Sequence, residues 1–424
     1  MEGFEKFYRK SWDQRLSVLK AEKKLTEKQI LLLKQCAVFP EIGDTQIENF
    51  ITQYHLPEGL ALNFMIDGQE YLIPMVTEEP SVIAGASHGA AIVKTSGGFK
   101  TEIKQRAMRG QVVIENVSEP EKLRQLLLKK KNDILRSAAA SHPSIIRRDG
   151  GPLALRVRVL AKDLVSLDLI IDTKEAMGAN MINTMLEAVA EQLRHECHLD
   201  VLMAILSNYS TECLTTSVCR IKTAALAKKG LSGSEIAHKV AQASRVAQLD
   251  PYRAVTHNKG IMNGIDAVVI ASGNDWRATE AAIQAYAARD GQYRGLSTWQ
   301  VVDDCLCGSL TIPVPIGSVG GSISIVPLVK VNSQLRQEQG VKNLQKIIVS
   351  VGLAQNLAAL YALVTDGIQQ GHMNLQLKSL AAAAGAKGAE ITQVVTSLKN
   401  MQQKDLATAK QILQEIRNKE HTNE

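Results

Sequence analysis

The spacing of hydrophobic residues changes within the first eighty positions of the chain. Residues 10–37 carry apolar side chains at helical spacing, which predicts an amphipathic helix. Residues 60–77 contain two apolar runs joined by Asp67-Gly68, a dipeptide typical of tight turns. This second pattern predicts a β-hairpin.

The hairpin leads into a small apolar stretch, residues 81–94, which predicts a helix. Pro80 stands where a helix tolerates proline best, at its first turn. Glu79 is therefore expected at a strand-to-helix junction. Such junctions often hold functional side chains.

Residues 111–207 show a longer alternation of strand and helix patterns. The expected elements are a strand at 111–117, a basic helix to about residue 140, strands at 153–160 and 164–172, a helix at 177–196 and a strand at 199–206. This β-α-β-β-α-β order is that of the ferredoxin-like fold. We therefore expect a ferredoxin-like small domain at residues 109–214, inserted into a larger domain.

The remaining segments read mainly as helix. Residues 341–365 are apolar on nearly every side, which predicts a buried helix. Residues 376–424 look like a separate helical appendix, with a mobile connection at the Ala381–Ala384 run and a polar helix at 391–419. The expected class is α+β, with a large, mainly helical domain formed by residues 1–108 and 215–375.

Composition narrows the classes of function. The 424 residues are 45% hydrophobic, 22% charged and only 4% aromatic, which argues against stacking on single-stranded nucleic acid. A net charge of +6 suits anionic ligands but is too small for a nucleic-acid footprint. The N-terminus lacks the apolar core of a signal peptide, and no apolar run is judged long enough for a membrane span, so we expect a cytoplasmic protein without membrane contact.

The six cysteines do not form a recognisable metal or disulfide pattern. Cys305 and Cys307 are spaced too closely for a zinc knuckle, and the pair His195 and Cys197 lacks a second ligand pair nearby. Packing is the better interpretation for these side chains. We expect no metal.

No G-x-G-x-x-G sequence follows any predicted strand, which argues against a Rossmann domain. A bound dinucleotide would need another loop. The candidate is residues 175–183, between a strand and a helix, where Gly178 lets the backbone approach a ligand at the helix N-terminus. Taken alone, this segment is better explained by a simple turn glycine, which is the commoner role of a glycine at the start of a helix.

Polar residues are unusually dense at 250–266 and 272–278, although apolar runs such as 267–271 flank them. Polar groups within a core need hydrogen-bonding partners or a chemical task. From the pattern alone, a structural polar network and an active site are equally good interpretations.

Five segments together resemble the motifs of HMG-CoA reductase (3-hydroxy-3-methylglutaryl-CoA reductase), in that family's order and across essentially the whole chain. The segments are Glu78-Glu79-Pro80-Ser81, residues 175–183, the run from His257 to Gly264, Gly273-Asn274-Asp275, and Gly371-His372-Met373. The resemblance is to the soluble, largely bacterial class II enzymes. It implies reduction of HMG-CoA to mevalonate by two hydride transfers from a nicotinamide cofactor.

The resemblance also implies four catalytic roles. Lys259 would stabilise the oxyanion that develops on the substrate, and Asp275 would lie beside Lys259 and tune its charge. Glu79 would deliver a proton to the substrate carbonyl oxygen. His372 would protonate the departing CoA thiolate, a task that suits a group titrating near neutrality.

Binding roles follow from the same resemblance. Substrate contacts are expected from Ser81, Arg253, Asn263, Asn208 and Gln355, and cofactor contacts from Glu175, Met177, Gly178, Ala179, Asn180 and Asn183. Gly317–Gly321 matches a family loop near the cofactor. His142 occupies the position at which NAD-using relatives carry an acidic residue for the ribose 2′-hydroxyl, and Arg147 and Arg148 lie close by. We therefore predict a preference for NADPH, with NADH possible as a substitute.

Finally, the resemblance implies a homodimer, or a higher even oligomer, with active sites at the subunit interface. Residues 376–424 would form a flap that closes over the site. Two alternatives stay open at this point. One is the same chemistry run oxidatively in mevalonate catabolism, and the other is a CoA-ester binding protein without redox function.

Overall fold

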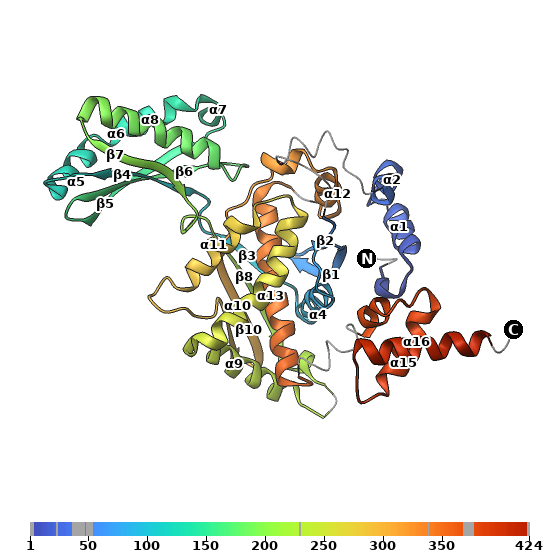
Figure 1. Ribbon diagram of the computed structural model, residues 1–424. Helices are drawn as coiled ribbons and strands as arrows, with labels where there is room; N and C mark the ends of the chain where they lie inside the picture. Colours follow the sequence, from blue (N-terminus) through green and yellow to red (C-terminus); the bar gives the residue numbers. More distant parts are fainter. Residues whose placement is uncertain are drawn as a thin grey trace.

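The computed structural model describes residues 4–22, 24–35, 47, 54–228, 230–337, 339–367 and 377–421. It is a mixed helix and sheet protein, as expected (Figure 1). Helical segments fill the middle of the molecule around one long central helix, α13. A sheet-and-helix unit extends from one side of this body, and the last helices form a separate group near the C-terminus.

The large body contains two sheets and most of the long helices. Its strands are β1 (Glu58–Ile66), β2 (Gln69–Val76), β3 (Lys100–Ile103), β8 (Leu214–Lys222), β9 (Ser297–Val302) and β10 (Cys305–Pro313). Its helices are η1 (Phe7–Arg9), α1 (Trp12–Ala21), α2 (Glu27–Gln35), α4 (Val82–Lys94), η2 (Thr223–Leu226), α9 (Gly233–Leu249), α10 (Pro251–Ala271), α11 (Trp276–Ala287), η3 (Gly321–Ser324), α12 (Pro327–Leu335) and α13 (Val341–Val364). The four-stranded antiparallel sheet β3-β8-β10-β9 was not predicted from the sequence.

The predicted hairpin is present as β1 and β2. Asp67 and Gly68 both have positive φ, at 52° and 87°, as the tight turn requires. The single N-terminal helix predicted over 10–37 is wrong, because α1 ends at Ala21 and α2 begins at Glu27. Thr26 and Gln29 exchange capping bonds here, with Thr26 N donating to Gln29 Oε1 at 2.8 Å and Gln29 N donating to Thr26 Oγ1 at 3.4 Å.

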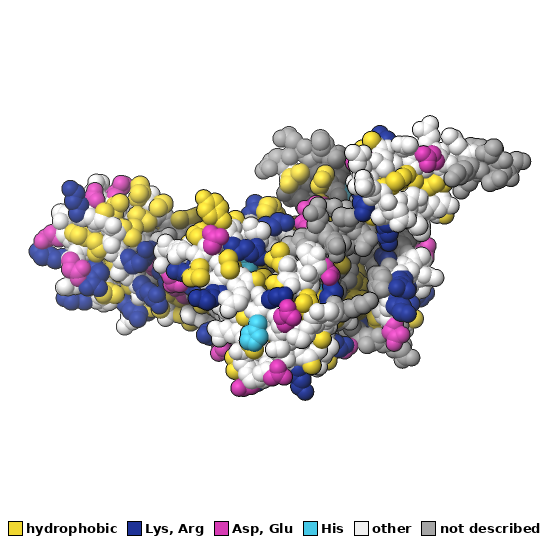
Figure 2. Space-filling view, turned by 90° about the horizontal axis from the view of Figure 1, so that it is seen from below, with side chains coloured by type: hydrophobic (Ala, Val, Ile, Leu, Met, Phe, Trp, Pro, Cys, Tyr) yellow, Lys and Arg dark blue, Asp and Glu magenta, His cyan; other side chains and the backbone are white. Residues whose placement is uncertain are grey.

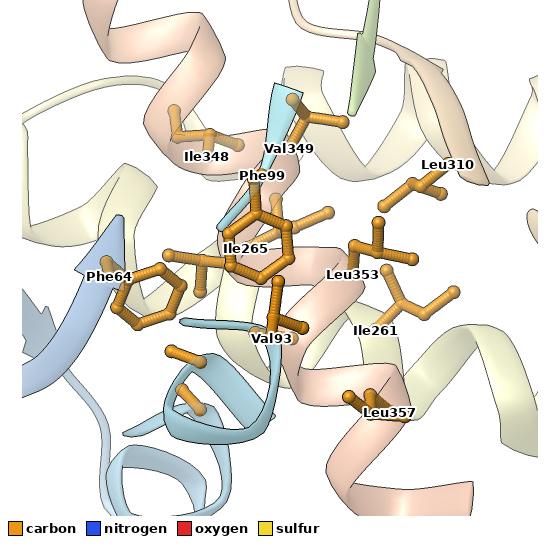
Figure 3. Close-up of a cluster of buried hydrophobic side chains, with 14 of the residues drawn as sticks. Phe64, Val93, Phe99, Ile261, Ile265, Leu310, Ile348, Val349, Leu353 and Leu357 are labelled. Carbon is orange, nitrogen blue, oxygen red and sulfur yellow. The ribbon is translucent and has the colours of Figure 1, made fainter. Parts of the chain in front are cut away.

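The central helix α13 is the buried helix that the sequence predicts. By length and composition alone it is apolar enough to cross a membrane, which corrects the expectation that no run qualifies. Most of the helix is instead buried inside the body. There Ile348, Val349 and Leu353 pack against Ile261 and Ile265 of α10 (Figure 3).

Glycines allow the closest approaches to α13. A Cβ on Gly89 of α4 would lie 2.1 Å from the carbonyl oxygen of Ala354, and a Cβ on Gly264 of α10 would lie 3.0 Å from Val351. Both helices therefore press their backbones against α13. This packing fixes the two helices that carry or flank Glu79 and Lys259.

The small unit follows the β-α-β-β-α-β order. Its elements are β4 (Met108–Glu115), α5 (Pro120–Lys129), α6 (Lys131–Ser141), α7 (Pro143–Ile146), β5 (Gly151–Ala161), β6 (Leu164–Asp172), α8 (Ala179–Cys197) and β7 (Asp200–Ser207). The spatial order is β5-β6-β4-β7, with every neighbouring pair antiparallel. The helices lie on one face of this sheet. Viewed from the other side, the unit presents apolar and basic side chains to solvent (Figure 2).

The C-terminal residues form their own small core. Residues 377–383 are helical, followed by α15 (Ala389–Lys399) and α16 (Leu406–His421). The mobile connection predicted at Ala381–Ala384 is wrong, because Ala381 is fully buried in this core. The single helix predicted over 391–419 is also wrong, because Asp405 caps a new helix by accepting a hydrogen bond from Thr408 N at 2.8 Å.

Candidate active site

Glu79 and Lys259 meet in a partly open position on the large body. Glu79 lies between β2 and α4, as predicted, and Lys259 lies in the middle of α10. Lys259 Nζ is 3.2 Å from Glu79 Oε2. The two side chains are 64% and 33% exposed, so a ligand can reach the ion pair. An accessible ammonium beside a carboxyl group offers both positive charge and a proton-transfer partner to a polarised carbonyl.

The polar residues just before Lys259 are structural. His257 is buried, and its Nε2 lies 2.7 Å from Ser297 Oγ and 3.1 Å from Asn356 Nδ2. Burial, together with the nearby charge of Arg253, lowers the pKa of His257 to about 4, so the imidazole is neutral. The two interpretations of this run therefore apply to different residues: His257 belongs to a structural polar network, whereas Lys259 faces the open side.

Asn258 completes this structural network. It donates to the Arg294 carbonyl at 2.9 Å and accepts from Leu296 N at 2.9 Å. These bonds hold α10 to the segment that leads into β9. They fix the part of the helix that carries Lys259, whose own side chain is exposed and contacts Glu79.

Three predicted substrate residues lie near this pair in the fold. Asn263 is one helical turn beyond Lys259 and partly exposed, and Arg253 is half-buried in the first turns of α10. Burial lowers the pKa of Arg253, and its guanidinium forms no ion pair within the described part of the chain. Gln355 of α13 is 7% exposed and packs against Gly85 and Gly264.

The Gln355 side chain has an unsatisfied hydrogen-bond acceptor. Its Oε1 is buried and has no hydrogen-bond partner among the described residues. A buried amide oxygen without a protein partner needs a donor from another source, such as a water molecule or a ligand group. Ser81 is the N-cap of α4, two residues after Glu79. Asn208 instead lies exposed in the turn after β7, at the edge of the small unit.

Asp275 is not brought to Lys259 within the described chain. Its carboxylate caps α11 by accepting from Ala278 N at 3.0 Å, and it lies 3.6 Å from Arg277. Helix α10 runs on to Ala271, so its end is about 18 Å beyond Lys259 at roughly 1.5 Å per residue. No ion pair joins Asp275 to Lys259 between described residues.

The loop that begins at Glu175 has a backbone suited to a dinucleotide. Gly178 has φ of 95° and is the N-cap of the 19-residue helix α8, with no side-chain capping bond. The first N–H groups of α8 are therefore not satisfied by a cap side chain and can face an anionic or hydroxyl group. Met177 and Ala179 are half-buried beside Gly178, and Asn180 is exposed.

Two predicted cofactor residues already have protein partners. The Glu175 carboxylate accepts a hydrogen bond from Val341 N at 2.8 Å, at the start of α13, and another from Ser318 Oγ. Asn183 Oδ1 accepts from Leu206 N at 2.9 Å. Both residues therefore hold the loop and α8 in place, in addition to any contact with a ligand.

His142 lies between α6 and α7, with its Nδ1 3.1 Å from Ser144 Oγ. Arg147 and Arg148 are exposed and form no ion pair in the described ranges. Gly151, just after them, pairs with Asp172 at the end of β6, three residues before Glu175. The basic segment and the candidate cofactor loop therefore lie at the same end of the small unit.

His372, with Gly371 and Met373, lies outside the described residues. In the described ranges, no group of three His, Cys, Asp or Glu side chains has a metal-binding arrangement.

Sequence reasoning missed Arg106 as a residue that shapes the site. Arg106 Nη2 donates to the Ala176 carbonyl at 2.9 Å and to the Ile316 carbonyl at 3.0 Å. A lone arginine after a short strand gives no sequence signal for such a role. Asn274 belongs to the polar stretch and to the family motif, but its bonds to Gly317 were not predicted from the sequence.

Comparisons with known proteins agree on one family. Residues 11–377 match the family model described as hydroxymethylglutaryl-coenzyme A reductase. The chain is 37% identical over 415 residues to the 3-hydroxy-3-methylglutaryl-coenzyme A reductase of Archaeoglobus fulgidus, covering 97% of this chain and 94% of that protein. It is 31% identical over 339 residues to a probable reductase of Borreliella burgdorferi, covering 79% and 77% of the two chains.

Solved structures give the same result. The class II reductase of Streptococcus pneumoniae bound to NADPH in open conformations is 44% identical, with a TM-score of 0.83 over 85% of this chain and 100% of that chain. A second structure of the Streptococcus pneumoniae enzyme has the same identity and TM-score over 97% of this chain and 99% of the other.

Proposed function

The chain belongs to the hydroxymethylglutaryl-coenzyme A reductase family, and we propose that the Glu79–Lys259 pair is its reacting centre. The protein is an oxidoreductase that reduces HMG-CoA to mevalonate and CoA in the mevalonate pathway. The observation that carries the assignment of the centre is the accessible 3.2 Å ion pair between Lys259 and Glu79. The oxidative and binding-only alternatives are not favoured.

Lys259 acts on the substrate carbonyl. The cofactor, when bound, supplies hydride to the carbon of this carbonyl group. Negative charge then develops on the carbonyl oxygen. The Lys259 ammonium stabilises this charge, because a positioned donor is worth most where charge appears in the transition state. Glu79, as the protonated carboxylic acid, delivers the proton that turns the oxyanion into a hydroxyl, and the resulting carboxylate forms the ion pair with Lys259.

When the C–S bond of the resulting thiohemiacetal breaks, the hydroxyl proton returns to Glu79 and mevaldehyde forms for the second hydride transfer, while His372 is proposed to protonate the departing CoA thiolate. Arg253, Asn263, Ser81 and Gln355 are proposed to bind the substrate. The guanidinium of Arg253 has no ion-pair partner among the described residues and suits the carboxylate of the substrate. The Oε1 of Gln355 has no hydrogen-bond partner there and suits a hydroxyl donor. Asn208 is proposed to act from the small unit.

The loop from Glu175 to Asn183 is proposed to bind the cofactor. Gly178 has a left-handed backbone conformation, and together with the uncapped N-terminus of α8 it fits a ribose or pyrophosphate. The basic segment with Arg147 and Arg148, beside this loop, fits a 2′-phosphate. His142, Arg147 and Arg148 bring no negative charge to that end of the unit. We therefore propose NADPH as the preferred cofactor, in line with the Streptococcus pneumoniae structure bound to NADPH.

This preference has a direct test. Changing Arg147 and Arg148 together to glutamate should raise the KM for NADPH about ten-fold or more, since a lost charged hydrogen bond costs about 1.5–3 kcal/mol. The KM for NADH should stay the same. Equal effects on both cofactors would contradict recognition of the 2′-phosphate by this segment. Initial rates with NADH more than about ten-fold above those with NADPH would contradict the preference itself.

A homodimer with interface active sites is proposed from the exposed side of α10. Tyr252 and Val255 are 90% and 55% exposed and lie on the same helical face as Lys259. Large apolar side chains left bare beside a reacting centre favour a covering subunit. We propose that a second copy docked here brings its own Asp275 to Lys259, because no ion pair joins the two residues within the described chain.

The domain division is proposed from three separate cores. The large domain is 1–108 with 215–375, the ferredoxin-like small domain is 109–214, and the C-terminal flap is 376–424. Each has its own cluster of buried apolar residues. The independent core of the flap supports a part that moves as a unit. We propose a cytoplasmic location, because α13 is buried in the core.

The deciding experiment mixes the purified protein with HMG-CoA and follows nicotinamide absorbance, with NADPH and NADH in parallel. Oxidation of two cofactors for each CoA released is expected. Binding of cofactor and HMG-CoA without oxidation would instead identify a CoA-ester binding protein. Oxidation of mevalonate as the faster direction under cofactor ratios found in cells would favour the catabolic alternative.

A further inference from the structure

Asn274, the residue before Asp275, is bound on both sides of its amide to one residue of a distant loop. Its Nδ2 donates to the Gly317 carbonyl at 3.0 Å, and its Oδ1 accepts from Gly317 N at 2.8 Å. The side chain thus pairs with the loop backbone as a neighbouring strand would. Gly273, with φ of 71°, turns the chain out of α10 and sets Asn274 in this position.

The other side of the same loop touches the cofactor loop. Ser318 N donates to the Glu175 carbonyl at 2.8 Å, and Val319 pairs with Ala176 as a parallel bridge. Gly317 itself has no room for a side chain. A Cβ there would lie 2.7 Å from Met177 N, so the two backbones are in direct contact.

Arg106 and Glu175 both stabilise the contact between the Gly317 loop and the cofactor loop. Arg106 bridges the carbonyls of Ala176 and Ile316, and its Nη1 donates to Thr173 Oγ1 at 3.3 Å. Glu175 ties the loop to the start of α13. Residues 316–319 are therefore held between Asn274 on one side and the cofactor loop on the other.

We propose that Asn274 is a positioning residue that sets Asp275 and the cofactor loop at a fixed separation through Gly317. This inference rests on the proposed function. Asp275 and the cofactor loop of one chain then form a single rigid half of the site, which meets Lys259 and Glu79 as a unit. Hydride transfer is sensitive to such spacing, since a misplacement of about 1 Å can cost about 100-fold in rate.

The alternative is that Asn274 only stabilises the fold. Asn332 provides a matched control, because its Nδ2 donates to the carbonyl of Ala271 at 2.9 Å, at the end of the same helix. Asn332 lies on α12 and has no bond to Gly317. Changing either residue to alanine removes an amide that bonds to backbone near the end of α10, but only Asn274→Ala cuts the link to the cofactor loop.

The test compares Asn274→Ala and Asn332→Ala in the full-length protein. It measures melting temperature, NADPH binding by fluorescence, kcat, KM and the deuterium isotope effect with labelled NADPH. For Asn274→Ala we expect kcat to fall about 10- to 100-fold, with both KM values within about two-fold. The isotope effect on kcat should rise, because hydride transfer becomes slower than the other steps. Asn332→Ala should lower only the melting temperature.

An isotope effect and kcat in Asn274→Ala that match those of Asn332→Ala would overturn the positioning role while leaving the proposed function intact. Absence of HMG-CoA-dependent oxidation in the wild-type protein would overturn both. If Asn274→Ala does not fold, Asn274→Asp replaces it. This variant keeps the acceptor for Gly317 N and loses the donor, so the same changes are expected at smaller size.

Discussion

The two halves of the active site differ in how many of their hydrogen bonds are already made. The substrate half holds Lys259 with one ion pair, Arg253 with none among the described residues, and Gln355 with a buried oxygen that has no partner there. In the cofactor half, the protein bonds are concentrated at the Gly317 junction, where Asn274 and Arg106 each make two or more hydrogen bonds.

This difference indicates a division of work. Unpaired side chains suit the half that is proposed to bind a charged substrate, because the new contacts replace water rather than protein bonds. Bonds already made at the Gly317 junction suit the half that is proposed to hold a hydride donor at one distance, because preorganised groups need no rearrangement during reaction. Substitutions in either half test this division of work.

The largest effect is expected at Lys259. Lys259→Met keeps the length of the side chain and removes its charge, so kcat should fall about 100- to 1,000-fold, the cost of deleting one oxyanion donor. NADPH binding, measured by fluorescence, should stay unchanged. Lys239→Met is the control, because Lys239 of α9 also pairs with a glutamate, Glu235 at 2.7 Å, on an exposed surface. A Lys259→Met enzyme with near-normal kcat would remove the lysine from the chemistry.

Removing residues 377–424 should have the next largest effect. The deleted part contains a hydrophobic core of its own, so the rest of the chain should fold and keep the oligomeric state of the full-length protein. Turnover should fall on the order of 100-fold, because water enters a site that the flap no longer covers. Leu413→Asp, which disrupts only the flap core, should give a similar loss. A fully active truncated protein with unchanged oligomeric state, measured by the absorbance assay and light scattering, would rule out the flap role.

The sequence predicted well what depends on local pattern. The hairpin at Asp67-Gly68, the order of elements from β4 to β7 and the buried helix α13 follow from hydrophobic periodicity and turn residues. It failed where a short capping signal breaks a long helical pattern, as at Thr26 and Asp405. The hydrophobic periodicity of the sequence continues through such a break, whereas the helix itself ends there.

The features of the site that were predicted are also those that depend on local motifs. Glu79 and Lys259 lie together as their motifs imply. The Gly317 junction was not predicted, because Asn274 and Gly317 are 43 residues apart and no local pattern links them. The structural use of Glu175 at the start of α13 was missed for the same reason, since its partner Val341 is 166 residues away.

Gly317→Ala tests the rigidity of the cofactor half with a smaller expected effect. The added Cβ would meet backbone atoms of the cofactor loop, which cannot rotate away, so the loop must shift. Overpacking of this kind costs about 1–3 kcal/mol, so the Kd for NADPH should rise about ten-fold. Gly59→Ala is the control, because its Cβ meets only the flexible tip of Ile83 at 2.8 Å. Unchanged NADPH affinity in Gly317→Ala would show that the loop is not held rigidly.

His257 should have the smallest effect on turnover at pH 7.5, because it holds α10 in place and does not face the substrate. Its effect is on stability as a function of pH. Burial holds its pKa near 4 in the folded protein, whereas an unfolded histidine titrates near 6.5. Between these values the unfolded state binds more protons, so the free energy of unfolding falls as the pH drops from about 6.5 towards 4. The loss from this group is about 3 kcal/mol at most, at about 1.36 kcal/mol per pKa unit.

Urea unfolding at pH 7.5 and at pH 5 measures this contribution. His257→Gln lacks the titrating group, so its stability should depend less on pH than that of the wild-type protein, although it should be less stable at pH 7.5 through the loss of contacts with Ser297 and Asn356. The exposed His238 of α9 is the control, and His238→Gln should keep the wild-type pH dependence. If His257→Gln keeps the full wild-type slope, the neutral buried imidazole is not its source. If the slope flattens while kcat at pH 7.5 is retained, the residues next to Lys259 serve the fold, and the chemistry of this helix lies with the lysine.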